Sequence, residues 1–410
     1  MQNLTREFLL AIPKTDLHVH LDGSLRLGSL IELAREQKVE LPSQTEAGLK
    51  ELVFKDKYQN LPEYLHGFKY TVQCLQTPEA LERAAYELAL DNFAEGVCYI
   101  EPRFAPQLHS RPDFPIEQVL ASVDKGLKRA QTELNSSAEV KSGAKVPFEY
   151  GIIGCAMRMF TAGFSRYFKS LYELHPMMPE SEIFSLASLD LVRAMIKARD
   201  ELGIPVVGFD LAGAEKGYPA EDHRAAYLFA HKHFLKKTVH AGEAYGPPSI
   251  FQAITDCFAD RIGHGTNLFD DKLVPLENEL ERKKYVAGLA KYIADQRITI
   301  ELCLTSNMQT IPELSNLKDH PLRQMLKEKL SVTFCTDNRL VSHTTVTDEI
   351  EKAVEAFNIS PHRLRHSIIY GFKRSFFAKS YTEKRAYVRK VIDAYEAVEQ
   401  RFGVNSSADL

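Results

Sequence analysis

Histidines and carboxylates gather at the ends of short apolar runs in this 410-residue chain. His18 and His20 close one run, His240 lies near the end of a second, and Asp337 lies near the end of a third. Side chains alternate along a strand, so His18 and His20 are expected on the same side, which suits two ligands of one metal. Three imidazoles and one carboxylate suit zinc with one position open for water. The alternatives are ordinary polar strand ends and, for Asp337, a helix cap.

Two further polar residues accompany these candidate ligands. Glu243 follows the third histidine after two small residues, and His264 stands between two glycines at the end of another run. Glycine is a poor strand residue, so its presence around His264 favours the close approach of a ligand over simple core packing. His231 and His233 repeat the spacing of the first pair in a helical run, where residues two apart point to different faces. We therefore do not include that second pair in the site.

Other charged residues at predicted strand ends have a structural interpretation. Glu101 and Arg103 end one run, and the sequence favours a fixed ion pair there over a catalytic role. The same interpretation applies to Arg158 and Glu215.

Short apolar runs alternate with segments of helical spacing, the pattern of β/α units and a parallel sheet. Eight strands separated by helices favour an α/β fold of the closed (β/α)₈ TIM-barrel type, with an open doubly wound sheet as the alternative. In a barrel the ends of these strands meet at one rim, where the candidate residues would converge. The eight runs cover 15–21, 96–104, 148–157, 206–213, 237–243, 261–266, 298–307 and 331–338.

The remaining segments are expected to decorate a single barrel domain over residues 1–410. Residues 26–95 read as several helices inserted after the first strand, and such an insertion would leave from the catalytic rim as a lid or pocket wall. The tail after Asp348 has a helical pattern and is expected on the outside of the barrel. The polar segment 134–146 is typical of a mobile surface loop.

The composition excludes several classes of partner. The formal net charge of -4 and a pI near 6.4 give no basic face for nucleic acid or an anionic membrane. The apolar stretch 8–12 is too short for a signal peptide or a membrane span. Six scattered cysteines favour free thiols in a reducing compartment, and so a cytoplasmic protein. A small-molecule partner fits best, and the sequence leaves the oligomeric state open.

Taken together, these segments resemble the adenosine deaminase family. The first strand motif, Pro13-Lys14-Thr15-Asp16-Leu17-His18-Val19-His20-Leu21-Asp22-Gly23-Ser24-Leu25, looks like that of the family. Further similar segments follow in family order over nearly the whole chain, at 61–65, 208–213, 240–243, 262–265 and 305–307.

The resemblance implies a role for each candidate residue. His18, His20, His240 and Asp337 would bind one Zn²⁺ per chain. Glu243 would donate a proton to the purine ring, and His264 would act on the attacking water.

It also implies three substrate contacts. Asp22 resembles the acid that contacts the ribose, and Gly213 matches a glycine whose backbone N–H meets the ring. Asn338 stands where many members have a second aspartate. Asn offers an oxygen acceptor but cannot hold a charge, which puts its ring contact in doubt.

The implied reaction is the zinc-dependent hydrolysis of adenosine and deoxyadenosine to inosine products and ammonia. One alternative is the same chemistry on another 6-aminopurine nucleoside, such as aminodeoxyfutalosine. The lid around 61–71 would decide between the two substrates. An AMP deaminase is disfavoured because the predicted loops show no excess of basic residues for a phosphate. An inactive zinc-bearing binding protein on the same scaffold is a further alternative. The presence of both Glu243 and His264 argues against it.

Overall fold

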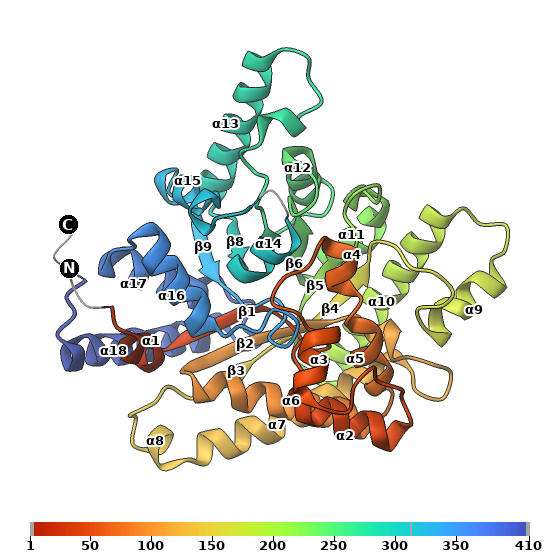
Figure 1. The fold of residues 1–410 in the computed structure, drawn as a ribbon, viewed down its shortest axis with the longest axis horizontal. Coiled ribbons are helices and arrows are strands. Elements are labelled where there is room, and N and C mark those ends of the chain that lie inside the picture. The colour runs from red at the N-terminus through yellow and green to blue at the C-terminus, as the bar shows by residue number, and fades with distance from the viewer. Residues whose placement is uncertain (1–3, 312–313, 407–410) are drawn as a thin grey trace.

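The computed structural model describes residues 4–311 and 314–406 and contains a closed parallel barrel (Figure 1). Neighbouring strands pair in parallel in chain order, and the short β3 (Glu149–Tyr150) pairs with β2 beside them. The eight barrel strands are β1 (Lys14–His20), β2 (Val97–Phe104), β4 (Ile152–Met157), β5 (Val206–Ala212), β6 (Lys236–Ala241), β7 (Arg261–His264), β8 (Thr299–Leu302) and β9 (Ser331–Phe334).

The barrel closes between its first strand and the segment that follows its last. Val19 bridges to Asp337, whose carbonyl accepts from the His20 N–H at 2.6 Å and whose N–H donates to the His18 carbonyl at 2.8 Å. This closure confirms the (β/α)₈ barrel and excludes the open sheet. β1 and β5 are buried along their whole length, as expected of strands with packing on both faces.

Helices surround the strands on the outside. A single apolar cluster runs from Phe8 to Val404 and joins the strands to these helices. The outer helices are α1 (Arg6–Ala11), α6 (Pro78–Ala94), α7 (Ile116–Ser136), α10 (Glu180–Leu202), α11 (Arg224–Lys232), α12 (Pro247–Thr255), α13 (Glu279–Gln296), α15 (Leu322–Lys327), α16 (Val346–Phe357), α17 (Pro361–Arg374) and α18 (Tyr381–Phe402). The last three confirm the helical tail.

The insertion after β1 is helical, as the sequence predicts, but its last helix belongs to the barrel. α6 packs along α7, whereas four shorter helices precede it, the first tied to α6 through the hydrogen bond between Ser29 and Glu87 and the last two at the rim. These are α2 (Leu27–Gln37), α3 (Glu46–Leu52), α4 (Leu61–Leu65) and α5 (Phe68–Cys74). α4 contacts α14 (Leu304–Thr310), so the insertion reaches across the rim to the loop after β8.

Two sequence predictions are wrong in part. Strand β8 ends at Leu302, and the second half of the predicted run 298–307 is the helix α14, because a buried apolar run does not distinguish a strand from a helix. The segment 134–146 is not all loop. α7 continues to Ser136, and α8 (Ala138–Lys141) follows directly because the Ser137 side chain caps it by accepting from the Val140 N–H.

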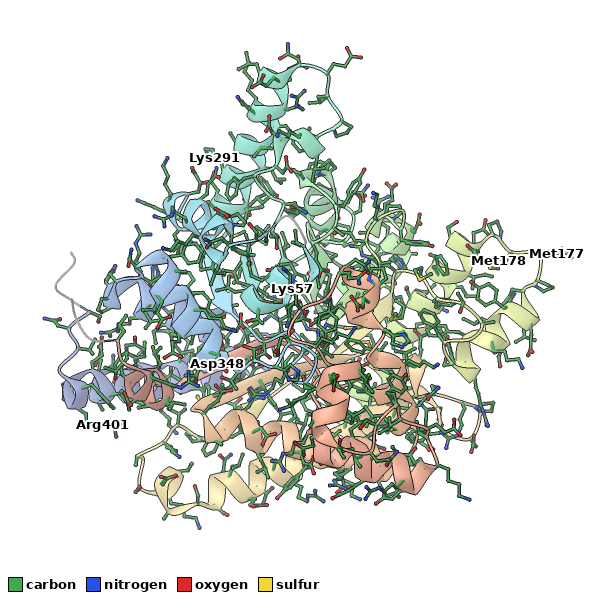
Figure 2. All side chains as sticks on the ribbon, viewed as in Figure 1. Lys57, Met177, Met178, Lys291, Asp348 and Arg401 are labelled. Atoms are coloured by element: carbon green, nitrogen blue, oxygen red, sulfur yellow. The ribbon has the colours of Figure 1, made fainter. Side chains whose placement is uncertain are left out.

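Shorter elements connect these parts. α9 (Arg166–Leu174) and the loop that joins it to α10 extend away from the barrel, and Met177 and Met178 lie at the tip of that projection (Figure 2). Four 3₁₀ turns cover Pro106–Leu108, Ala220–His223, Asp271–Leu273 and Leu317–Asp319. All six cysteines are free and buried. No helix in the described part of the chain is long and apolar enough to cross a membrane.

Candidate metal and catalytic site

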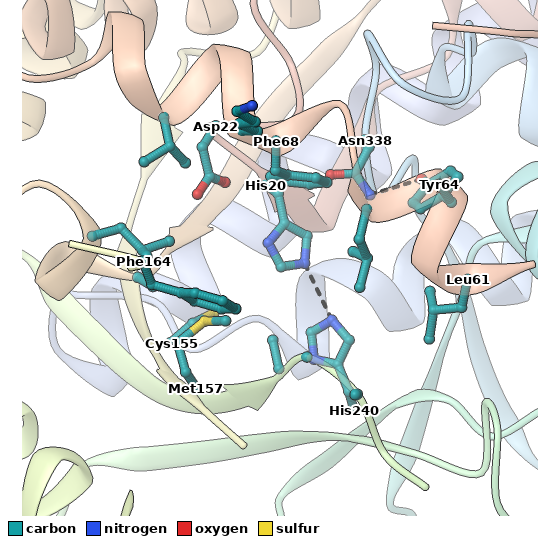
Figure 3. Close-up of a pocket in the computed structure, with 18 of the residues that line it drawn as sticks. His20, Asp22, Leu61, Tyr64, Phe68, Cys155, Met157, Phe164, His240 and Asn338 are labelled. Atoms are coloured by element: carbon teal, nitrogen blue, oxygen red, sulfur yellow. Dashed lines mark hydrogen bonds between the residues drawn. The ribbon is translucent and has the colours of Figure 1, made fainter. Parts of the chain in front are cut away.

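A pocket of about 470 Å³ opens at the carboxyl ends of the barrel strands. Its wall contains His20, Asp22, Glu243, His264 and other residues that the sequence singled out, together with side chains of the insertion (Figure 3). The predicted convergence at one rim is therefore present, because the parallel strands all end there.

The four predicted metal ligands lie together at the bottom of this pocket. The Nε2 atoms of His20 and His240 are 3.1 Å apart (Figure 3). Asp337 Oδ1 lies 3.4 Å from His18 Nε2 and 3.5 Å from His20 Nε2. Three imidazole nitrogens and a carboxylate oxygen thus face a common point.

His264 lies beside the same group. One donor atom each from His18, His240, His264 and Asp337 lie within 4.8 Å of one another. With His20, the cluster has five side chains, one more than the four ligands of a structural zinc site. One of them is available for another role at the same centre.

The donor atoms fit a divalent cation. His18 Nε2 is buried and makes no hydrogen bond to any described residue. The Nε2 atoms of His20 and His240 face each other at 3.1 Å and need either a shared proton or a shared ion. Burial opposes ionisation of Asp337, but His18, His20 and His264 together lower its pKa far below the usual range. Burial also lowers the pKa of His20 well below its ordinary value, which leaves a neutral imidazole able to bind a metal.

Two buried carboxylates contact the far ring nitrogens of two of the candidate ligands. Asp210 on β5 lies 3.1 Å from His240 Nδ1, and Glu301 on β8 lies 2.9 Å from His18 Nδ1. A carboxylate at Nδ1 fixes the tautomer that presents Nε2 to a metal. Arg103 joins the two carboxylates with ion pairs of 2.9 Å to each.

Asp210 and Glu301 are not among the candidate residues predicted from the sequence. The signal that was available is a charge inside a run that is otherwise apolar and buried, since such a charge must be paired. Glu101 and Arg103 do form ion pairs, as expected, but with other strands. Glu101 pairs with Arg261 on β7.

Glu243 lies just after β6, in a turn held by another carboxylate. Glu215 accepts hydrogen bonds from the backbone N–H groups of Gly242 at 2.7 Å, Glu243 at 3.0 Å, Ala244 at 2.6 Å and Tyr245 at 2.9 Å. Burial raises the pKa of Glu243 to about 8, and the negative charges of Asp337 and Glu215 add to the effect. Glu243 is therefore a neutral acid at pH 7.

His264 is held in a constrained position at the end of β7. Its backbone has φ 66°, and a Cβ on the preceding Gly263 would come within 3.0 Å of His18 Cε1. Its Nδ1 contacts Asn307 Nδ2 at 3.0 Å, and its Nε2 lies 3.8 Å from Glu243 Oε2. Burial and the nearby His18 lower its pKa well below the ordinary value, so the ring is neutral and can accept a proton. Asn307 comes from α14, the helix that the sequence analysis read as a strand end.

The three predicted substrate contacts all line the pocket. Asp22 Oδ1 is buried with no hydrogen-bond partner among the described residues, and burial raises the pKa of Asp22 to about 7. Asn338 Nδ2 donates to the Tyr64 hydroxyl at 2.8 Å, while its Oδ1 has no partner in the described structure. Gly213 follows β5 with φ 104°, a conformation that favours glycine.

The outer wall of the pocket is apolar and comes largely from the insertion. Leu61, Leu65 and Phe68 line it, and the Phe68 ring meets the His20 ring edge-on at 6.4 Å between centroids. An apolar wall around a few convergent polar groups is typical of a small-molecule site.

Known proteins match this chain over most of its length. Residues 13–394 match the family model described as adenosine deaminase. The adenosine deaminase of Mycobacterium ulcerans is 35% identical over 395 residues, covering 96% of each chain. Adenosine deaminase 1 of Streptomyces coelicolor is 34% identical over 382 residues, covering 93% of this chain and 86% of that protein.

Among solved structures, a zinc-bound amidohydrolase from Burkholderia ambifaria has the same fold. Its TM-score is 0.76 at 19% identity, with 98% of this chain and 96% of that chain covered.

Proposed function

The chain belongs to the adenosine deaminase family, and from that premise we propose that it hydrolyses adenosine and deoxyadenosine to inosine products and ammonia with one zinc ion. The observation that carries the proposal is the placement of Glu243, a neutral buried acid, beside His264 and the cluster of metal donors. An aromatic amine is a poor leaving group and water is a poor nucleophile. The reaction therefore needs an acid that protonates the ring and a base that takes a proton from the attacking water.

We assign the metal to His18, His20, His240 and Asp337, whose donor atoms face one point. Bound there, zinc would act as a Lewis acid and make water a better nucleophile. Asp210 and Glu301 would hold the two imidazoles that they contact in the ligating orientation. This assignment leaves His264, the fifth member of the cluster, for proton transfer.

The chain's own residues supply the remaining steps. Glu243 donates its proton to ring N1, which weakens the aromatic resistance to attack at C6. His264 is neutral, and among the described residues its nearest carboxylate is Glu243 at 3.8 Å. It accepts a proton from the attacking water and passes it to the amine nitrogen as the C6–N bond breaks and ammonia leaves. The unpartnered Asp22 Oδ1 accepts from a ribose hydroxyl, and the Gly213 N–H meets the ring. The free Asn338 Oδ1 keeps an acceptor at the pocket wall, although without a charge.

The apolar lid favours a nucleoside over a nucleotide as the substrate. Leu61, Leu65 and Phe68 cover the pocket, and a phosphate would need desolvation against them, while Lys69 is the one Lys or Arg side chain among the described residues that line it. The six free, buried cysteines support a reducing compartment such as the cytoplasm.

The experiment that tests this function is the loss of ultraviolet absorbance when the purine amine is hydrolysed. Adenosine, deoxyadenosine, AMP, adenine and aminodeoxyfutalosine are compared, before and after treatment with a chelator and again after zinc is restored. We expect turnover on adenosine and deoxyadenosine that is lost with the chelator and recovered with zinc. Turnover on another aminopurine alone would overturn the assignment of adenosine as the substrate. Metal-loaded protein that is inactive on all of these compounds would overturn the proposal that the chain is an enzyme.

A further inference from the structure

A second cleft lies at the opposite end of the barrel from the proposed active site. It has a volume of about 680 Å³ and lies between the end of α13, the end of α17 and the first half of α18. Six cationic side chains line it, and none of its lining residues is acidic: Arg297, Lys373, Arg374, Lys384, Arg385 and Arg389. We call this the basic cleft. A neighbouring cleft shares four of these six and extends to Lys236, the first residue of β6, which places both at the amino ends of the strands.

The positive charge of the basic cleft is local. The chain as a whole has a formal net charge of -4, so this concentration does not follow from composition. It arises because the consecutive helices α17 and α18 and the distant end of α13 each place cations at the same point. Like charges this close repel one another. A cleft lined by cations without acids attracts and concentrates anions.

Most of these cations are not neutralised by the protein. Arg389 pairs with Asp393 at 2.6 Å, but Arg297, Lys373, Arg374, Lys384 and Arg385 make no ion pair within residues 4–311 and 314–406. Arg374 Nε is buried and has no hydrogen-bond partner in the described structure. A buried guanidinium nitrogen without an acceptor is costly, and an anion in the cleft would satisfy it.

One ammonium group is fixed at the base of the cleft. Lys384 Nζ donates to the carbonyls of Lys373 at 2.9 Å and Ser375 at 2.6 Å, which ties α18 to the end of α17. Burial lowers the pKa of Lys384 to about 8; Glu101 opposes this, while Arg261 and Lys236 lower it further.

Two tyrosines border the cations. Lys373 Nζ lies 5.6 Å and the Arg374 guanidinium 5.8 Å from the centroid of the Tyr370 ring, which holds both near the cleft. Tyr381 stands at the rim beside Arg385 with 75% of its surface exposed. An exposed ring next to a cationic cleft can stack on a planar group of a bound anion.

We propose that the basic cleft binds a small ligand carrying two or more linked phosphates. A single phosphate carries at most two charges near pH 7, fewer than the five unpaired cations. The planar, charged forks of arginine match phosphate oxygens in pairs. The linked phosphates can belong to a nucleotide or to an inorganic polyphosphate.

The test is calorimetric titration of the metal-loaded full chain with inorganic tripolyphosphate, followed by the magnesium complex of ATP. We expect saturable binding with one site per chain, weakened at least tenfold in the Lys373→Gln/Arg374→Gln double variant. The matched control is Lys390→Gln/Arg401→Gln, which removes two exposed charges from α18 outside the cleft and is expected to change the affinity less than twofold. The exposed Lys373→Gln single variant serves if the double variant does not fold.

Each result decides between stated alternatives. Equal affinity for both probes means that the cleft recognises phosphates alone, whereas tighter ATP binding that Tyr381→Ala abolishes assigns it to nucleotides. Binding that is unchanged in the double variant would overturn the proposal, because the probe would then act elsewhere, for example by removing the active-site metal. An equal loss in the control variant, or no saturable binding to the native chain, would overturn it as well.

Discussion

Glu243 is the residue on whose protonation the proposed reaction depends. Replacing it in the variant Glu243→Gln keeps the shape of the side chain but removes the acid. We expect kcat to fall by on the order of 10²–10⁴-fold, the usual contribution of a positioned acid or base. Zinc content, measured by atomic absorption, is expected to stay at one per chain because Glu243 is not a proposed ligand. The exposed Glu279→Gln serves as the control. Turnover within tenfold of the native chain would remove Glu243 from the mechanism.

The pH dependence of turnover reports the same proton. The pKa of Glu243 is raised to about 8, so the acid form is present below that pH and is lost above it. We therefore expect kcat/KM for adenosine to decline as the pH rises through about 8, with one proton lost. A profile that remains flat to the alkaline side of this range would contradict the assignment of Glu243 as the acid.

At the scale of the element, the turn after β6 depends on Glu215 for its shape. In Glu215→Gln the four backbone N–H groups lose their charged acceptor, so we expect a lower kcat with zinc retained by His240, which precedes the turn. The negative charge of Glu215 also helps to raise the pKa of Glu243. The alkaline limb of the pH profile should therefore move to lower pH in the variant.

That shift separates a positioning role from a purely structural one. Simple destabilisation of the turn would lower kcat without moving the limb. The control is Glu221→Gln, an exposed carboxylate of a nearby 3₁₀ turn, which should leave both unchanged.

The inserted helices contribute through their apolar side chains. Phe68 covers the pocket and touches the His20 ring, so Phe68→Ala removes apolar contact with the nucleoside. Losing the burial of one aromatic side chain costs about 1.5–3 kcal/mol, which corresponds to an increase in KM of about 10- to 100-fold, with kcat changed much less. Leu52→Ala on α3 of the same insertion, where Leu52 is 54% exposed, is the control. An unchanged KM in Phe68→Ala would show that the insertion does not contact the substrate.

The elements also show which features of the site a sequence can reveal. The strands and their polar ends were predictable because buried parallel strands are apolar runs and their ends converge. α14 was not, because Cys303 and Leu304 extend the apolar run of β8 into the start of this helix. The contact between Asn307 and His264 was missed with it. Asp210 and Glu301 were missed for a different reason. Their partners lie on other strands, and the pairing becomes evident only when the barrel is closed.

At the scale of the whole molecule, the metal is expected to stabilise the fold. The donor cluster exists only in the folded chain, so binding stabilises the native state by mass action, by about 4 kcal/mol at a free zinc concentration one thousand times Kd. We expect chelation to lower the thermal midpoint in scanning calorimetry and added zinc to restore it. The His20→Ala variant, which lacks one proposed ligand, should show a much smaller shift. An equal shift in that variant would place the stabilising ion elsewhere.

The seam of the barrel has a consequence for biosynthesis. Asp337 pairs with the backbone of β1 next to His18 and His20, so one and the same contact closes the barrel and completes the proposed ligand set. A nascent polypeptide emerges from the ribosome with its first two imidazoles early and its carboxylate near the end of translation. Until that last strand arrives, the early histidines have no partner across the seam. If zinc binds at the proposed ligands, tight loading requires that synthesis has passed Asp337, and a prematurely terminated product would compete poorly for the ion.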